Sequence, residues 1–234
     1  MKRLPVMGCV MLSAILLLGA CTSKPVAPDW QVNAYAALKG FSVAYLSGNT
    51  RLADSELARA RLEIASTGRA DLLARAELTR CAVRVASLEF DDCAAYQPFA
   101  ADAHASEQAY AAFLSGRWTA LDVALLPAQH RTWVLQAESN KATDRPAPAT
   151  SLLGAMEDPL ARLVAAGVLL QNKRLTAPEM AQATDTASAQ GWRRPLLAWL
   201  GLQRQQATEA GDLAGAARLQ RRIDLVLQAL PKIP

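Results

Sequence analysis

The sequence is poor in aromatic residues, in histidine and in any excess of charge. Aromatic side chains make up 6% of the 234 residues, two residues are histidine, and the formal net charge is +4. β-Branched residues are also scarce, which argues against a β-sandwich or a β-barrel. The near balance of charge gives no electrostatic basis for binding nucleic acid, so we expect no nucleic-acid partner.

The motifs of common enzyme classes are missing as well. The chain has no Gly-x-Ser-x-Gly, Ser-x-x-Lys or His-Glu-x-x-His motif, and no glycine-rich loop that would bind a phosphate. His104 and His130 fall in segments predicted to be separate helices, and no third metal ligand is in view. We therefore expect no metal site and no cofactor, and we expect both histidines to be solvated or hydrogen-bonded.

Apolar residues, alanine above all, are abundant instead. Hydrophobic residues account for 52% of the chain and charged residues for 20%. A substantial core can therefore form, in one domain or in two closely joined halves. Because alanine favours helices that pack closely through small side chains, the composition predicts an all-α protein.

Residues 1–20 are predicted to be a signal peptide for secretion. Lys2 and Arg3 precede an apolar run from Val6 to Leu18, and small residues follow. The run is short for a membrane span, which needs about 20 apolar residues. Removal of the segment leaves 23 of the 25 basic residues against 21 acidic ones.

The stretch Leu18-Gly19-Ala20-Cys21 resembles the lipobox of bacterial lipoproteins. The resemblance implies that cleavage leaves Cys21 first and that acyl chains such as palmitate anchor it in a membrane. In Gram-negative lipoproteins an Asp after the cysteine retains the protein in the inner membrane. Thr22 stands there, which implies the outer membrane, facing the periplasm, with residues 21–28 as a short lipidated tether. The alternative is a soluble secreted protein with a chance cysteine.

The remaining cysteines are predicted to pair. Cys9 leaves with the signal peptide and Cys21 is acylated, so Cys81 and Cys93 remain in an oxidising compartment. A disulfide between them would stabilise the fold by roughly 2–3 kcal/mol. If the preceding helix ran on to Leu88, residues 89–93 would have to return extended to meet Cys81. The alternative is two buried, unpaired thiols.

Apolar residues recur at helical spacing from Asp29 onward. Two stripes predict an antiparallel pair of helices: Ala34, Leu38, Phe41 and Tyr45, then Ala53, Leu57, Ala60 and Ile64. Further helices are predicted over about 70–88, 102–114 and 118–126, and Pro127 is predicted to open another turn or helix that runs to about Ala137. The proline-rich segment 140–150 is predicted to be a loop or hinge between an N-terminal helical part, 29–139, and a C-terminal helical part, 151–234.

The C-terminal part carries clear signals for helix ends. Helices are predicted to begin at Asp158-Pro159, at the Thr176/Glu179 capping box, at Arg194-Pro195 and at Asp212. Gly191 and Gly211 are predicted to end the helices before them.

One segment, Ala44–Asn49, is echoed as Ala112–Arg117, 68 residues later. The offset is twice the 34-residue period of tetratricopeptide repeats. Gly48, Asn49, Ala53, Leu57 and Ala60 resemble the turn and second helix of such a unit, although no unit keeps the full pattern of the first helix. The predicted fold is therefore all-α, with antiparallel helical hairpins stacked as a degenerate tetratricopeptide-like array or as an irregular helical bundle.

Two sets of side chains are candidates for contact with a partner. The five tryptophans are expected to pack in the core, with partner anchoring as the alternative. Six arginines of the last two helices are expected to form a solvated face, with an acidic partner or anionic headgroups as the alternative. These arginines are Arg193, Arg194, Arg204, Arg218, Arg221 and Arg222.

One short motif resembles that of lytic transglycosylases. Glu138-Ser139 precedes Ser151–Met156, which is similar to the downstream motif of that family. Glu138 would then be a general acid in a sugar groove. The spacing is long and the later Tyr-Asn motif is absent, so the protein is expected not to be an enzyme.

The predicted localisation and the predicted fold of stacked hairpins together indicate a periplasm-facing outer-membrane lipoprotein that acts as a protein-binding adaptor. Stacked hairpins present an extended face suited to a peptide or protein. Pilotins and adaptors for peptidoglycan enzymes are lipoproteins of this kind, so an envelope protein is the expected partner. The alternatives are a peptidoglycan-acting enzyme that uses Glu138 and a structural lipoprotein without a dedicated partner.

Overall fold

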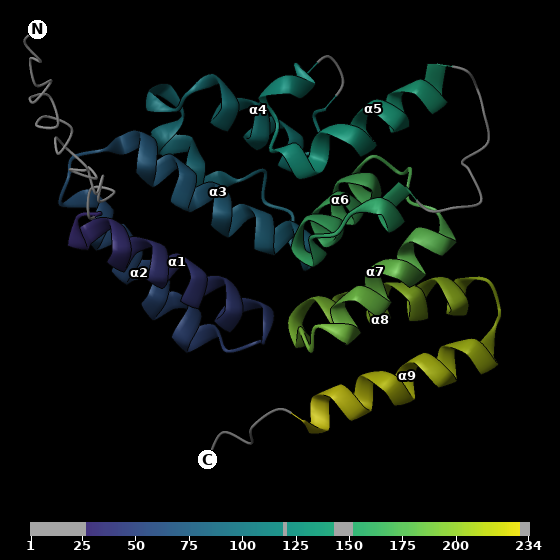
Figure 1. Ribbon diagram of the computed structural model, residues 1–234. Helices are drawn as coiled ribbons and strands as arrows, with labels where there is room; N and C mark the ends of the chain where they lie inside the picture. Colours follow the sequence, from purple (N-terminus) through teal and green to yellow (C-terminus); the bar gives the residue numbers. More distant parts are fainter. Residues whose placement is uncertain (1–26, 119–120, 143–151, 230–234) are drawn as a thin grey trace, which may run out of the picture.

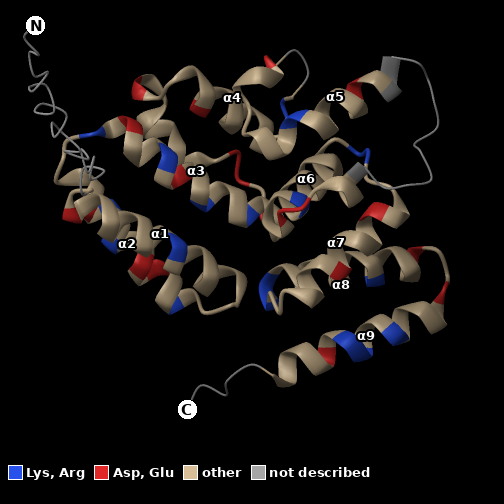
Figure 2. Ribbon diagram, viewed as in Figure 1, with Lys and Arg blue, Asp and Glu red and all other residues tan. Residues whose placement is uncertain are grey.

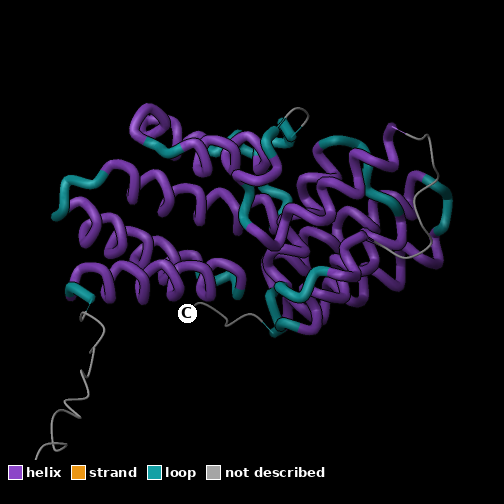
Figure 3. The backbone as a smooth tube through the Cα atoms, turned by 45° about the horizontal axis from the view of Figure 1, so that its top comes forward, coloured by secondary structure: helices purple, strands orange, loops and turns teal. Residues whose placement is uncertain are grey.

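The computed structural model describes residues 27–118, 121–142 and 152–229. In these ranges the chain consists of helices joined by turns and short loops, and no strand is present (Figures 1 and 3). The predicted all-α fold of antiparallel helical hairpins is thereby confirmed. The lipobox with Cys21 and most of the proline-rich loop lie outside the described residues.

An antiparallel hairpin opens the described chain. α1 (Asp29–Leu46) and α2 (Thr50–Ala65) meet at a turn in which Gly48 has a φ of +84°, a conformation that favours glycine. The side chain of Asn49 caps α2 by accepting from the backbone N–H of Leu52. Phe41 and Leu57 are buried between the helices, as the two apolar stripes predict.

The central helix is α3 (Ala70–Ala86), which contacts α1, α2, α4 and α6. It is joined to α2 by Arg61, whose Nε and Nη2 donate to the buried Glu77 carboxylate at 2.5 and 2.8 Å. This bidentate pair raises the pKa of Arg61 and fixes the register of the two helices. The α1–α2 hairpin and α4 contact α3 from different sides, as Figure 1 shows.

The segment after α3 departs from the prediction. It contains the 3₁₀ helix η1 (Ala94–Asp102), α4 (Ala105–Leu114), the 3₁₀ turn η2 (Val123–Leu125) and α5 (Ala128–Ala142). The helix predicted over 118–126 is wrong, because Asp122 caps the backbone N–H of Ala124 and the chain turns there. Trp118 and Leu126 are nevertheless buried, so their apolar spacing reflects core packing without a helix.

The C-terminal part begins with the 3₁₀ turn η3 (Leu152–Ala155). Four helices follow: α6 (Pro159–Gln171), α7 (Ala177–Ala189), α8 (Arg193–Glu209) and α9 (Leu213–Gln228). The predicted caps at Asp158 and Asp212 and the Thr176–Glu179 capping box are all present. Gly191 and Gly211 end α7 and α8 in left-handed conformations, as predicted.

Small residues bring α3 and α6 into unusually close contact. A Cβ atom at Gly167 would lie 2.5 Å from the backbone oxygen of Val85 and 2.9 Å from its Cγ1. Ala165 and Ala166 beside it are fully buried. The helices therefore pack through small side chains, as the alanine-rich composition predicts.

The repeated Leu-Ser-Gly segment forms the same helix end twice. Ser47 and Ser115 each donate to the carbonyl four residues earlier, and Gly48 and Gly116 both have positive φ. The likeness ends after the turn, because Asn49 opens α2 whereas Arg117 leads into an irregular segment. The repeated segment therefore encodes a helix end and not a second complete hairpin.

Two arginines of α8 join the C-terminal part of the chain to the end of α1. Arg193 Nε donates to the Ser47 oxygen at 2.9 Å, and Arg194 Nε donates to the Tyr45 oxygen at 2.9 Å. Arg194 also lies over the Tyr45 ring, 4.2 Å from its centroid. The expectation of a solvated face is wrong for these two residues, because they satisfy carbonyls at the end of α1. Figure 2 shows basic residues along α9, where Arg218, Arg221 and Arg222 are exposed.

Candidate functional site

The predicted Cys81–Cys93 disulfide is present, with the two Cα atoms 5.2 Å apart. The return path differs from the one expected, because α3 ends at Ala86 and the chain reverses through left-handed residues. Leu88 and Cys93 have φ values of 60° and 55°. The bridge fastens η1 to α3 and so fixes the start of the segment that leads to α4.

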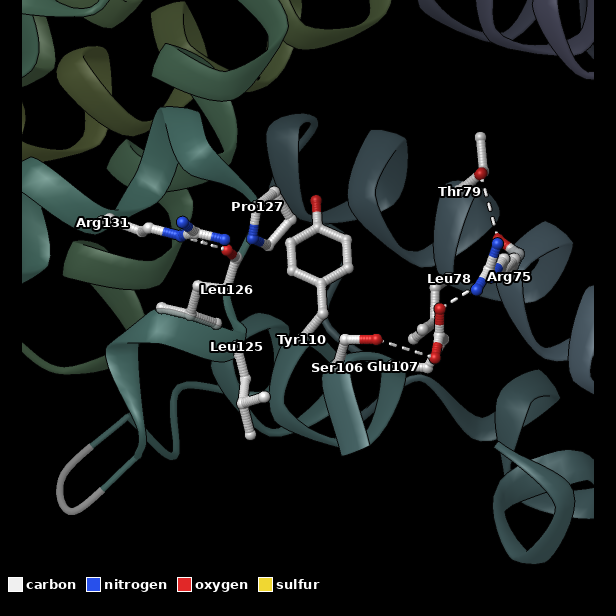
Figure 4. A pocket seen from close by; sticks show the side chains of 10 residues that line it. All are labelled: Arg75, Leu78, Thr79, Ser106, Glu107, Tyr110, Leu125, Leu126, Pro127 and Arg131. Carbon is white, nitrogen blue, oxygen red and sulfur yellow. Dashed lines mark hydrogen bonds and ion pairs between the residues drawn. The ribbon is translucent and has the colours of Figure 1, made fainter. Parts of the chain in front are cut away.

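An open groove lies on the side of α3 away from the first hairpin, and it is the candidate site. Its volume is about 400 Å³, which falls within the range of small-ligand and peptide-side-chain pockets. α3, α4 and the η2–α5 segment supply its walls, as Figure 4 shows. The lining residues are Arg75, Leu78, Thr79, Ser106, Glu107, Tyr110, Leu125, Leu126, Pro127 and Arg131.

Helical spacing explains which side chains reach the groove. Leu78 and Thr79 follow Arg75 on α3 by three and four residues, so the three side chains share one face. Ser106 and Tyr110 are four residues apart on α4 for the same reason. The chain turn before α5 supplies the third wall.

One end of the groove is a fixed ion pair. Arg75 Nε donates to Glu107 Oε1 at 2.6 Å, and the Ser106 hydroxyl donates to Glu107 Oε2 at 3.0 Å. Glu107 is buried, so both of its oxygens are satisfied inside the protein. This end can present the outer edge of the Arg75 guanidinium but no free carboxylate.

The opposite end carries a guanidinium without an acidic partner among the described residues. Arg131 Nε donates to the Leu126 oxygen at 2.7 Å, which holds the side chain against the groove wall. The rest of the exposed guanidinium points to no carboxylate in the described part of the chain. Arg131 can therefore donate hydrogen bonds to a carboxylate of a ligand.

The Tyr110 ring stands between these two ends (Figure 4). Burial raises the pKa of Tyr110, so the hydroxyl keeps its proton at physiological pH and can donate a hydrogen bond. Leu78, Leu125 and Pro127 add apolar surface around the ring. The groove thus combines an apolar lining with the Tyr110 hydroxyl and the Arg131 guanidinium.

An aromatic cluster packs against the Tyr110 ring. The Tyr110 ring lies 5.8 Å from the His130 ring and 6.0 Å from Phe113. His130 is 1% exposed, and its Nδ1 accepts a hydrogen bond from Trp133 Nε1 at 3.4 Å. Burial lowers the pKa of His130 to about 4, so the imidazole is neutral at physiological pH. His130 is hydrogen-bonded as predicted, and it packs against the Tyr110 ring without lining the groove itself.

The other sequence candidates lie elsewhere. The exposed His104 is 3.6 Å from Asp71. Glu138 lies on α5 with its carboxylate 3.4 Å from Arg174 Nη1, and it lines neither the groove nor a second cavity between α5 and η3. Trp118, Trp133 and Trp199 are buried in the core, as predicted.

Sequence reasoning did not identify the groove. Glu107, Tyr110 and Arg131 belong to no recognisable motif. The site depends on contacts such as Arg75–Glu107, which join residues 32 positions apart on different helices. No local pattern in the sequence reports such a contact.

Residues 27–118, 121–142 and 152–229 contain neither a metal-binding cluster nor a membrane-spanning helix. Within these ranges no three His, Cys, Asp or Glu side chains are arranged to hold a metal ion. No helix in the same ranges is both long enough and apolar enough to cross a bilayer.

Comparison with known proteins leaves the function to be argued from this geometry. No protein-family model matches the chain, and no curated protein or solved structure matches it either. Because an all-α fold hosts many functions, the groove and the residues that line it are the features that bear on function.

Proposed function

We propose that this chain is an outer-membrane lipoprotein, anchored through acylated Cys21 and facing the periplasm, that acts as a protein-binding adaptor for an envelope machine. The observation that supports the proposal is the groove formed by α3, α4 and the start of α5. Its apolar lining, the Tyr110 hydroxyl and the Arg131 guanidinium suit an apolar side chain of a peptide that carries a carboxylate nearby.

Anchoring of the protein to the membrane would make binding in the groove more effective. A tethered adaptor raises the concentration of the bound partner at the membrane, so a modest affinity is enough. The groove walls are pre-organised, because Glu107, Arg75 and Arg131 are already held by internal hydrogen bonds. Little side-chain entropy is then lost when a peptide segment binds.

The proposal is tested by photo-crosslinking in cells. A photoreactive amino acid replaces Thr79 or Leu125 in the groove, and in a matched control it replaces Leu135, which is 56% exposed on α5 outside the groove. We expect one envelope protein to crosslink at positions 79 and 125 and not at 135. Mass spectrometry then identifies the crosslinked segment of that protein.

Two companion measurements separate the parts of the proposal. The mass of the mature protein shows whether Cys21 is acylated, and a Cys21→Ser strain shows whether capture of the partner depends on the anchor. Equal crosslinking at all three positions would contradict the groove as the recognition site. A peptidoglycan-cleaving activity lost in a folded Glu138→Gln variant would favour the enzyme alternative instead.

A further inference from the structure

The outward side of α1 is apolar although it is not covered. Val32 is 53% exposed, Tyr35 is 72% exposed and Val43 is 57% exposed. Their spacing places them on one side of the helix together with Ala36 and Lys39, which are also exposed. We call these five residues the α1 outer face.

The opposite side of α1 is apolar too, because it packs in the core through residues such as Phe41 and Ala37. A surface helix of a globular protein usually turns a polar side to solvent, and a helix that is apolar all round is usually buried. The outer face of α1 is thus the side that lacks a partner among the described residues.

The neighbouring helix α2 is more highly charged than α1, although it also exposes Leu52 and Leu62. α1 has two charged residues among its 18, Asp29 and Lys39, whereas α2 has six among its 16. Exposed positions of α2 include Arg51, Asp54 and Arg59. Figure 2 shows that the charges of the hairpin lie mainly on α2.

The chemistry of the α1 outer face fits the surface of a lipid bilayer. Tyrosine is favoured where an apolar body meets a polar boundary, and a lysine can bury its methylene stem while its ammonium reaches the headgroups. Lys39 is the charged residue of the face, and its sign matches anionic phospholipid. Asp29, the acidic residue of α1, precedes Val32 by three residues and borders the face at its N-terminal end, whereas Lys39 lies in the middle of the face.

The length of chain before α1 places this face near a membrane. Ala27 follows Cys21 by six residues, which can span at most about 22 Å. The helix itself is about 27 Å long, so its N-terminal half lies within reach of an acyl anchor on Cys21. This step rests on the proposed acylation of Cys21.

We propose that the α1 outer face lies on the bilayer surface and acts with the acyl chains as a second point of membrane attachment. α3 separates the α1–α2 hairpin from α4, so the groove is held on the side of the protein away from the membrane. Two points of attachment fix the orientation of the body, whereas an acyl tether alone leaves it free to rotate.

The test uses the acylated full-length mature protein in vesicles of phosphatidylethanolamine and phosphatidylglycerol. A nitroxide label is attached at Tyr35→Cys or Val43→Cys and, as a matched control, at Ala58→Cys on the exposed side of α2. The disulfide occupies Cys81 and Cys93, so each variant has one free thiol. We expect accessibility to an aqueous nickel chelate to fall by about fivefold or more on vesicles at positions 35 and 43, and to stay unchanged at position 58.

The outcomes that overturn the proposal are distinct from failure of the adaptor function. Equal accessibility at all three positions in protein whose acylation is confirmed by mass would overturn the membrane contact alone. Shielding at position 35 that appears without vesicles and grows with protein concentration would mean that a second copy covers the face. A mature protein without acyl chains would remove the anchor and overturn both proposals, and the crosslinks from Thr79 and Leu125 report on the adaptor function separately.

Discussion

Replacing Gly167 by alanine should destabilise the protein even though alanine is the better helix former. The added methyl group would meet the Val85 carbonyl oxygen at 2.5 Å and its Cγ1 at 2.9 Å. A backbone oxygen in a helix cannot rotate away, so α3 and α6 would have to separate within the core. Overpacking of this kind costs about 1–3 kcal/mol, and better helix propensity offsets about 1 kcal/mol of it. We expect a net loss of up to about 2 kcal/mol in the free energy of unfolding.

Gly201 provides the matched control, because it lies within α8 and a methyl group there would meet no atom within 4 Å. Gly201→Ala should raise the free energy of unfolding by about 0.5–1 kcal/mol. Urea unfolding followed by far-ultraviolet circular dichroism, on the Cys21→Ser form with its disulfide intact, measures both variants. If Gly167→Ala proved as stable as Gly201→Ala, the close contact between α3 and α6 would be refuted.

Three further perturbations have defined results. Cys93→Ala removes a bridge between residues 12 apart and should lower the free energy of unfolding by about 2–3 kcal/mol, and an unchanged urea midpoint would contradict this. The pKa of buried His130 is about 4 when folded and about 6.5 when unfolded, so the unfolded chain binds a proton first as the pH falls, and stability is lost below about pH 6.5. Between about pH 7.5 and about pH 5 we expect a loss of about 2 kcal/mol that disappears in His130→Phe and persists in His104→Gln. Arg194→Lys keeps the charge but loses the planar donor group that binds the end of α1, so calorimetry should show a lower Tm, corresponding to about 1–2 kcal/mol.

The parts of the fold that the sequence predicts are those set by neighbouring residues. The Thr176–Glu179 capping box and the N-cap of Asp158 each join residues three apart, so their sequence signals are self-contained. The Cys81–Cys93 pair followed from the small number of cysteines together with the expected compartment. Helix ends with Gly191 and Gly211 were predictable because glycine readily adopts the left-handed conformation.

The parts that escaped prediction depend on contacts between distant segments. Arg193 and Arg194 have the sequence signature of a solvated basic face, but they bind carbonyls about 146–149 residues away. The segment around Asp122 has apolar residues at helical spacing. The aspartate nevertheless caps the backbone N–H of Ala124, so the chain forms a short 3₁₀ turn there in place of an α-helix. The sequence predicts the helices that carry Arg75 and Tyr110, but it does not predict that α3, α4 and the start of α5 come together, so the groove itself could not be predicted.

The affinity of the groove for its partner segment is the measurement that tests the central claim most directly. The segment crosslinked at Leu125 is synthesised as a labelled peptide, and its Kd is measured by fluorescence anisotropy for the wild type, Leu125→Glu and Leu135→Glu. Both leucines are exposed, and Leu125 lines the groove whereas Leu135 does not. We predict that Leu125→Glu weakens binding by about tenfold or more while Leu135→Glu stays within about twofold of the wild type. Equal affinities for all three proteins would contradict the assignment of the groove as the recognition site.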